Sequence, residues 1–158
     1  MKAGFTLVEL LVVIAVTGMV LGLVIPSFTS FIQSQYLKQG AEQVLGDLRA
    51  AQSRSQTGMA DPSGNNVCWG ITIPKVTNCG VVDCTVNYDV GYSSTCNPGS
   101  FTVVSTNRLP GAVQAVAGGV IIFSRLTGRL SSAADVRLSL NSVDKHVIVE
   151  VGGNMYVQ

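Results

Sequence analysis

The stretch GFTLVELLVVIAVTGMVLGLVIP, residues 4–26, decides how the rest of the chain is organised. Between positions 5 and 25 almost every side chain is apolar, and Glu9 carries the only charge. A helix rises about 1.5 Å per residue, so roughly 20 apolar residues cross the hydrocarbon core of a bilayer. We therefore expect residues 5–25 to form a helix that can lie in a membrane.

Glu9 lies only one helical turn inside this apolar stretch. A charged carboxylate at the centre of a bilayer costs about 2.5–3.5 kcal/mol even on the most lenient scale, so an isolated one points to a functional site. The segment before the stretch is unusual too, because only residues 1–4 precede Phe5. Lys2 within this short segment favours an N-terminus held in the cytoplasm. A simple membrane anchor explains neither feature.

The order of these residues differs from that of a secretory signal peptide. A signal peptide has its small cleavage-site residues after the apolar region, whereas here Gly4 comes before it. Gly4, Phe5, Thr6 and Glu9, followed by an unbroken apolar run, resemble the class III leader of type IV prepilins and type II secretion pseudopilins. The resemblance implies that a prepilin peptidase cuts after Gly4 and methylates Phe5, and that the apolar helix stays on the mature chain.

After the apolar stretch the helical period continues in an amphipathic form. Apolar residues recur at spacings of three and four, which predicts a spine over residues 26–57 that ends near Gln56, with Gly58 as its C-cap. Pro26 should bend the helix or open it locally, because proline removes one backbone hydrogen bond and clashes with the preceding turn. The resemblance adds Gly18 and Gly22, since helices of that family often loosen between a mid-span glycine and such a proline.

Residues 58–158 are predicted to form a β domain outside the cytoplasm. Short runs rich in β-branched and aromatic residues, separated by glycine, proline and asparagine, predict strands at 67–73, 85–90, 101–105, 120–123, 136–140, 146–151 and 154–157. Gly152 and Gly153 are predicted to be a two-residue hairpin loop. The expected fold class is α+β, with a long N-terminal helix packed on antiparallel sheets in the manner of a pilin.

Four cysteines, Cys68, Cys79, Cys84 and Cys96, lie close together in the sequence. Outside the cytoplasm this predicts two disulfides. Zinc binding is disfavoured because the spacing contains no Cys-x-x-Cys pair and the single histidine, His146, is distant in sequence. Four cysteines allow three pairings. Among these we favour Cys68–Cys79 with Cys84–Cys96, because the second pair would brace the excursion between residues 85 and 95.

Composition and motifs argue against catalysis. The formal net charge is +1 and the lysines and arginines are not clustered, so binding of nucleic acid by phosphate neutralisation is disfavoured. His146 lies in an apparent strand, where a surface or pairing role is expected rather than general-base chemistry. Asp83 and Asp89 flank another strand near Cys84 and are interpreted as a solvated loop edge rather than a calcium site. We expect no cofactor, no metal and no enzymatic activity.

The C-terminal half refines the resemblance. GVIIFSRLTGRLSSAADVRLSL (119–140), RAAQ (49–52) and CWG (68–70) are similar to segments of the minor pilins and pseudopilins of the GspH/FimT/FimU group. Members of this group that capture DNA end in Gly-Arg-x-Arg, whereas this chain has GNMY at 153–156. Because those phosphate-binding arginines are missing, DNA is not an expected partner. Arg125, Arg129 and Arg137 remain candidates for a small basic face.

These features together favour a minor type IV pilin that is incorporated into an extracytoplasmic filament and primes its assembly. The expected partners are the prepilin peptidase, other minor and major pilins, and the inner membrane, which the chain would cross once with its domain in the periplasm. The resemblance implies that Glu9 pairs with the amine of a neighbouring subunit's Phe5 and so sets the register of assembly. A minor pseudopilin of a type II secretion system is the first alternative. A pilus-displayed adhesin or DNA receptor is the second, and it would need an exposed patch built from Trp69, Tyr88, Tyr92 or the three arginines.

Proteolytic processing provides the first test. We expect the mature protein to begin at Phe5 with a methylated α-amine, and we expect Gly4→Ala to preserve cleavage far better than a bulky residue at position 4. Mass analysis of the N-terminal peptide measures both outcomes. An intact Met1, or a cut beyond Pro26, would contradict the leader assignment.

Overall fold

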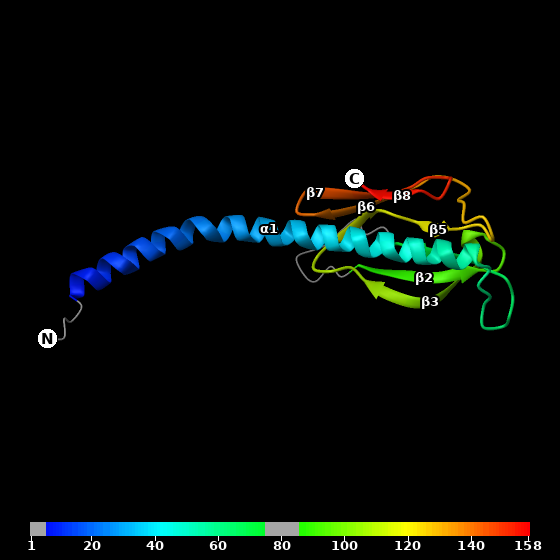
Figure 1. Cartoon of the computed structure of the whole chain (residues 1–158), viewed down its shortest axis with the longest axis horizontal. Helices are drawn as coiled ribbons and strands as arrows, with labels where there is room; N and C mark the ends of the chain where they lie inside the picture. Colours follow the sequence, from blue (N-terminus) through cyan, green and yellow to red (C-terminus); the bar gives the residue numbers. More distant parts are fainter. Residues whose placement is uncertain (1–5, 75–85) are drawn as a thin grey trace. The chain divides into compact units, whose positions relative to one another are not determined.

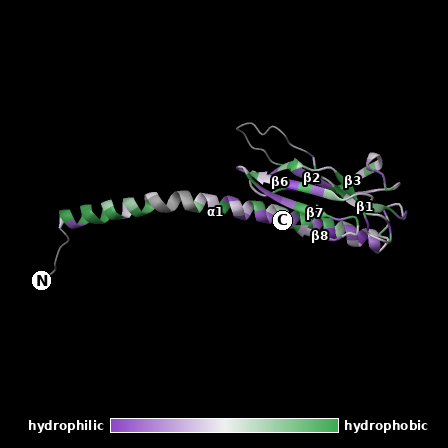
Figure 2. Cartoon of the chain, turned by 90° about the horizontal axis from the view of Figure 1, so that it is seen from above, coloured by the Kyte–Doolittle hydropathy of each residue, from purple (hydrophilic) through white to green (hydrophobic). Residues whose placement is uncertain are grey.

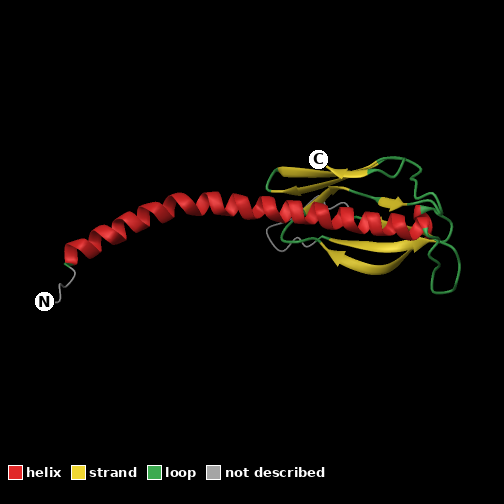
Figure 3. Cartoon of the chain, in the orientation of Figure 1, coloured by secondary structure: helices red, strands yellow, loops and turns green. Residues whose placement is uncertain are grey.

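The computed structural model describes residues 6–74 and 86–158, apart from the side chains of residues 23–27. Within these ranges one long helix, α1 (Leu7–Gln56), precedes eight strands. Backbone contacts divide the chain into two units between Ser34 and Gln35, so the second part of α1 belongs to the same unit as the strands. In Figures 1 and 3 this part of the helix lies along the strands, with β2 and β3 on one side of it and β6, β7 and β8 on the other. The expected α+β, pilin-like fold is confirmed.

The strands form two antiparallel sheets of four strands each. The first sheet has the order β3-β2-β1-β5 and the second has the order β4-β6-β7-β8. The first contains β1 (Cys68–Thr72), β2 (Asn87–Ser93), β3 (Phe101–Arg108) and β5 (Val120–Ile122). The second contains β4 (Gln114–Ala117), β6 (Ala134–Leu140), β7 (Val143–Val149) and β8 (Met155–Val157). A short 3-10 helix, η1 (Pro98–Ser100), leads into β3.

The sequence predicted seven of these eight strands and missed β4. Its residues, QAVA, include one β-branched side chain, so neither composition nor alternation indicates a strand.

The last hairpin loop was predicted one residue too short. The Glu150 N–H donates to the Asn154 carbonyl, the Gly153 N–H donates back to Glu150, and Gly153 has φ of +90°. This is a three-residue loop that includes Val151, with glycine in the left-handed position.

Helix α1 continues without interruption through Gly18, Gly22 and Pro26. The structure therefore differs from the expectation that the helix opens here. Proline removes one backbone donor and each glycine costs up to about 1 kcal/mol, yet the 50-residue helix continues through all three positions.

The C-terminus of α1 has the predicted glycine cap. Gly58 has φ of +68°, and its N–H donates to the Ser55 carbonyl at 3.3 Å. The Met59 N–H donates to the Arg54 carbonyl at 2.9 Å. These two bonds form a Schellman motif, which satisfies carbonyl groups that the helix itself leaves unpaired.

The core of the domain forms where one stripe of α1 meets both sheets. The stripe is fully or almost fully buried and consists of Leu37, Ala41, Val44, Leu45, Leu48 and Ala51. From the first sheet it packs with residues such as Ile71 and Tyr88, and from the second with Val136, Leu138 and Val147, all in one hydrophobic cluster. Burial of this stripe, at about 25 cal/mol per Å² of apolar surface, is the main force that holds helix and sheets together.

Polar bonds fix the rotation of the helix on the first sheet. The buried Tyr88 hydroxyl donates to Asp47 Oδ2 at 2.5 Å, and Asn107 Nδ2 donates to the same oxygen at 2.8 Å. Gln43 Nε2 donates to the Tyr88 hydroxyl at 3.0 Å and to the Arg108 carbonyl at 3.1 Å. Burial, together with the neighbouring Asp47 carboxylate, raises the pKa of Tyr88 above its ordinary value near 10.

A second group of polar bonds ties the last turns of α1 to loops that are distant in sequence. The buried Ser55 Oγ accepts from the Trp69 N–H at 2.8 Å. Gln52 Nε2 donates to the carbonyls of Gly128 at 3.1 Å and of Gly153 at 3.0 Å. Both glycines have positive φ, and a β-carbon on either one would collide with a glutamine side chain of the helix. Positive φ therefore favours glycine at both turns, and at Gly153 a β-carbon would also lie 2.9 Å from the Gly128 carbonyl oxygen.

Cys68 and Cys96 form a disulfide with 5.1 Å between their Cα atoms. The favoured pairing of Cys68 with Cys79 was therefore wrong. The physical reason is that β1 and β2 are antiparallel, and Cys68 pairs in register with Ser93, so the chain just after β2 returns to the start of β1. Cys79 and Cys84 lie outside the described residues, so a second disulfide stays a prediction.

Removal of this disulfide tests its contribution to stability. We expect the double substitution Cys68→Ala, Cys96→Ala to lower the free energy of unfolding by roughly 2–4 kcal/mol, mainly because the unfolded chain becomes less restricted. Denaturant titration of the purified protein measures this loss. A peptide map without reductant should show Cys68 bound to Cys96 and, if a second bond forms, Cys79 bound to Cys84. Cys68 bound to Cys79 would contradict the structure.

Tyr88→Phe tests the bond between the helix and the first sheet. We expect it to lower the free energy of unfolding by about 1–3 kcal/mol at neutral pH. The lost hydroxyl donates a hydrogen bond to Asp47 and accepts one from Gln43. The exposed Tyr156→Phe is the matched control and should change stability little.

The same pair of variants tests the pKa of Tyr88. A tyrosine whose pKa is raised by folding contributes stability that is complete below its unfolded value and is lost as pH rises above it. Between pH 10 and 12 the free energy of unfolding of the wild type should therefore fall more steeply than that of Tyr88→Phe, by up to about 1.4 kcal/mol per pH unit. Denaturant titrations at a series of pH values measure both slopes, and equal slopes would show that the Tyr88 hydroxyl ionises as readily in the folded protein as in the unfolded chain.

Candidate functional site

The N-terminal part of α1, residues 7–21, exposes a continuous apolar surface. Figure 2 shows it as a mainly hydrophobic segment. Its large apolar side chains are between 54% and 77% exposed; they are Leu7, Val8, Leu10, Leu11, Val12, Val13, Ile14, Val16, Met19, Val20 and Leu21. The Thr17 hydroxyl donates to the Val13 carbonyl at 2.6 Å, so this polar group needs no external partner. An exposed apolar surface of this extent marks a site of contact with other molecules.

A hydropathy search of the described residues found no helix with enough length and apolar character to span a membrane.

Glu9 lies in the first turn of α1 and takes part in a helix cap that the sequence analysis missed. Thr6 precedes the helix, and its Oγ1 accepts from the Glu9 N–H at 3.3 Å. Thr-x-x-Glu is the sequence pattern of a capping box, and it was the available signal. The carboxylate also lies near the positive end of the helix dipole, where a negative charge is favourable. Within the described residues Glu9 has no ion-pair partner; Gly4 and Phe5 lie outside them.

At the other end of α1, a strained turn presents an exposed leucine. Leu126 has φ of +64°, which costs a bulky residue about 1–3 kcal/mol, and its side chain is 76% exposed. Its N–H donates to the Ser55 carbonyl at 2.9 Å, so the turn is attached to the last turn of the helix. A cavity of about 160 Å³ next to it is lined by Gly58, Asn66, Arg125 and Leu126. Leu126 was not predicted from the sequence as a functional residue.

The three arginines proposed as a basic face have separate partners or positions. Arg125 donates to the carbonyls of Asn66 at 3.0 Å and of Ser94 at 3.2 Å, and so joins two loops. Arg137 forms a salt bridge with Asp144 across the β6–β7 pair. Arg129 follows the turn that carries Leu126 and is exposed. Because Arg137 is neutralised by Asp144, the three do not form one free basic surface.

The aromatic residues proposed for an exposed patch are mostly buried. Tyr88 is in the core, and Trp69 is only 5% exposed. Trp69 packs against Tyr92 with 5.6 Å between ring centroids, lies under the guanidinium of Arg54, and donates its indole N–H to the Met59 carbonyl. These residues stabilise the first sheet and the loop after α1. They offer little surface to an external ligand.

The remaining candidates for chemistry lie apart from one another. His146 Nδ1 is 3.0 Å from Asp135, on the exposed face of the second sheet, which agrees with the pairing role expected from sequence. Asp89 accepts from the Thr106 hydroxyl at 2.6 Å, and Asp83 lies outside the described residues. Among the described residues there is no group of three or more histidine, cysteine, aspartate or glutamate side chains that could hold a metal ion.

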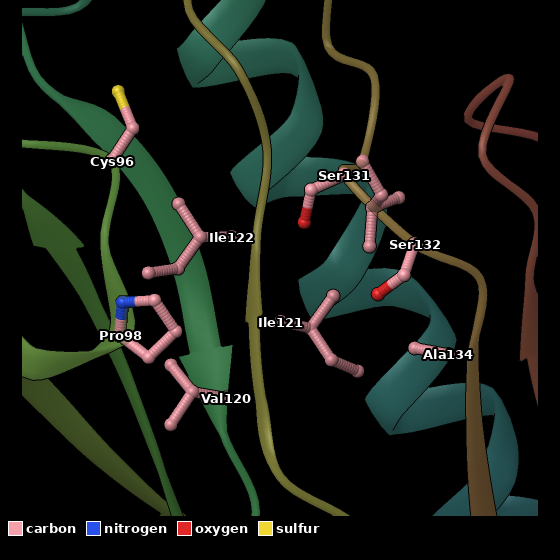
Figure 4. Close-up of a pocket in the computed structure, with 9 residues that line it drawn as sticks. Cys96, Pro98, Val120, Ile121, Ile122, Ser131, Ser132 and Ala134 are labelled. Atoms are coloured by element: carbon pink, nitrogen blue, oxygen red, sulfur yellow. The ribbon is translucent and has the colours of Figure 1, made fainter.

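A second cavity, of about 70 Å³, lies beside β5. Figure 4 shows Cys96, Pro98, Val120 and Ile122 on one side of it, and Ser131, Ser132 and Ala134 on the other, with Ile121 between. The described residues that line it include no acid, no base and no free thiol, since Cys96 is bonded to Cys68. The cavity is large enough for two or three water molecules and offers no general acid–base pair.

The comparisons with known proteins bear on the N-terminus. Residues 1–25 match the family model of the prokaryotic N-terminal methylation motif. This range contains Gly4, Phe5 and Glu9, the residues that carry the resemblance to prepilins. No curated protein and no solved structure matches the chain. The narrower resemblance to the GspH/FimT/FimU group stays a prediction. The N-terminus of this chain is thus a class III leader like that of type IV pilins.

Proposed function

We propose that the chain is a minor type IV pilin, a structural subunit that is incorporated into an extracytoplasmic filament and primes its assembly. The observation that carries the proposal is the exposed apolar surface of α1 directly behind a methylation leader. Before assembly, lipid covers this surface, with the N-terminus in the cytoplasm and the domain in the periplasm. In the filament, the apolar helices of other pilins take the place of lipid.

Glu9 is the residue that sets subunit register in this proposal. After cleavage at Gly4, the new amine of Phe5 is a positive charge at the end of an apolar helix. A neighbouring Glu9 neutralises it, and attraction between charges in an apolar surrounding depends on position far more sharply than packing of apolar side chains does. Breaking one side of such a buried pair typically costs about 3–5 kcal/mol.

The proposal assigns the chain no enzymatic activity, metal or cofactor, and no binding of DNA. For DNA, one observation supports this. At the C-terminal hairpin, where DNA-capturing relatives of the GspH/FimT/FimU group are expected to have arginines, Asn154 Nδ2 donates to the carboxylate of Glu150 at 3.2 Å. A carboxylate at that turn would repel phosphate.

A minor pseudopilin of a type II secretion system remains the alternative within the same class, because the leader and the helix serve both machines. Purification of the filament with its neighbouring subunits distinguishes the two.

Substitutions at Glu9 test the register role and separate it from the helix cap. Glu9→Val removes the charge and the acidic residue of the capping box, whereas Glu9→Gln keeps a capping side chain and removes only the charge. If Glu9 pairs with the Phe5 amine, both variants should insert in the membrane and fold, yet their amount in sheared filaments should fall at least about tenfold, as expected for a loss above 1.4 kcal/mol.

The membrane and filament fractions of tagged variants, compared with the wild type, measure this. If only the helix cap matters, Glu9→Gln should resemble the wild type while Glu9→Val fails. Wild-type amounts of both variants in the filament would refute the register role.

A further inference from the structure

We propose that Leu126 is the centre of a docking surface that inserts into an apolar pocket rimmed by carboxylates on another subunit of the same filament. The proposal rests on the proposed function and names a second contact, distinct from the apolar surface of α1. It also assigns a role to a residue that neither the leader nor the core explains.

The conformation of Leu126 is the first observation. A bulky side chain rarely adopts φ of +64°, and glycine or asparagine fits such a turn without strain. Gly128, two residues later, has φ of +61°, so this turn already contains one glycine in the same region. Since the Leu126 side chain is 76% exposed, the domain gains little burial in return for the strain. Strain of this kind, held in place by surrounding bonds, is characteristic of functional sites.

The turn is held rigidly, which a docking residue requires. The Leu126 N–H is bonded to the Ser55 carbonyl at 2.9 Å, and the Gly128 N–H to the Ser124 carbonyl at 2.9 Å. Arg125 ties the base of the turn to the loops at Asn66 and Ser94. Because these bonds fix the backbone, the side chain projects into solvent with little freedom to fold back, and little conformational entropy is lost on binding.

The surroundings of Leu126 indicate the chemistry of the partner. The exposed Met59 and the cavity of about 160 Å³ extend the apolar surface along the loop after α1. Arg125 directly precedes Leu126 and the exposed Arg129 follows three residues later. Arg54, whose guanidinium packs over Trp69, lies in the last turn of the helix to which the turn is bonded. Within the described residues none of these three arginines has an ion-pair partner. Asp61, in the loop after α1, accepts hydrogen bonds from the N–H groups of Asn65 and Ser63 in that loop, and these bonds hold the pKa of its carboxyl below the usual range.

An apolar centre with a basic rim is complementary to an apolar pocket with an acidic rim on a protein. A nucleic acid would meet the arginines with phosphates but would leave Leu126 and Met59 without apolar partners. A subunit of the same filament is the occupant to which we commit, because the filament brings folded domains into lasting contact at high local concentration.

Leu126→Gly tests the proposal because a structural role and a docking role predict opposite results. Glycine accepts the backbone conformation, so the unfolding midpoint should stay unchanged or rise. The amount of the variant in sheared filaments should fall at least about tenfold, as expected for loss of an apolar anchor at an interface. Val143→Thr, which alters another exposed apolar side chain on β7, is the matched control and should leave incorporation unchanged.

A photo-crosslinking amino acid, p-benzoylphenylalanine, at position 126 of the full chain identifies the neighbour directly. We expect an adduct to another pilin-type subunit, with aspartate or glutamate in the crosslinked peptide, and no such adduct from position 143. Arg129→Glu should reduce the yield of the adduct from position 126. If Leu126→Gly fails to fold, the crosslinking result alone decides whether Leu126 docks on another subunit.

Wild-type incorporation of Leu126→Gly, or no adduct to a pilin-type subunit from position 126, would overturn the docking role while leaving the filament role intact. Absence of the wild-type chain from the filament would overturn the proposed function. In that case the docking role would be decided in the membrane fraction, again by whether position 126 forms an adduct to a pilin-type subunit.

Discussion

Burial of one face of α1 against two sheets is the interaction on which the rest of the domain depends. The stripe from Leu37 to Ala51 is the surface that both sheets share, and in the described part of the chain no strand belongs to both of them. Each sheet has four strands, and β5 and β8 at their edges have only three residues each. Without the helix, each sheet would expose an apolar face to water. The domain therefore folds around the helix rather than simply beside it.

Polar bonds then select one arrangement among those that would bury the stripe. Asp47 and Gln43 bond to the first sheet through Tyr88 and Asn107, while Gln52 bonds to turns at Gly128 and Gly153. Apolar packing alone tolerates small rotations of a helix, whereas a buried hydrogen bond that is broken leaves an unsatisfied group and costs about 1–3 kcal/mol. The bond from Gln52 to the Gly128 carbonyl also attaches the turn that carries Leu126 to the end of the helix.

Features that depend on local sequence patterns were predicted, whereas features that depend on contacts between distant parts of the chain were missed. The helix, its glycine cap and seven strands follow from periodicity and turn residues, all of which act over a few positions. The disulfide was assigned wrongly because the pairing of Cys68 with Cys96 depends on antiparallel register between β1 and β2. Leu126 was missed for a related reason. Its turn is attached by the bond between its N–H and the Ser55 carbonyl, 71 residues earlier in the sequence, and no local sequence pattern indicates that contact.

The Thr6–Glu9 cap changes how the charge of Glu9 should be understood. In the separate chain the helix start is already satisfied, because Thr6 accepts from the Glu9 N–H and the carboxylate lies at the positive end of the helix. This local stabilisation, typically about 0.3–1 kcal/mol, is smaller than the cost of placing a carboxylate in lipid. A helix cap alone therefore does not account for a charge in a stretch built for an apolar surrounding. The proposed function supplies an external positive charge, because in it cleavage after Gly4 frees the amine of Phe5, whose attraction offsets the cost of removing the carboxylate from water.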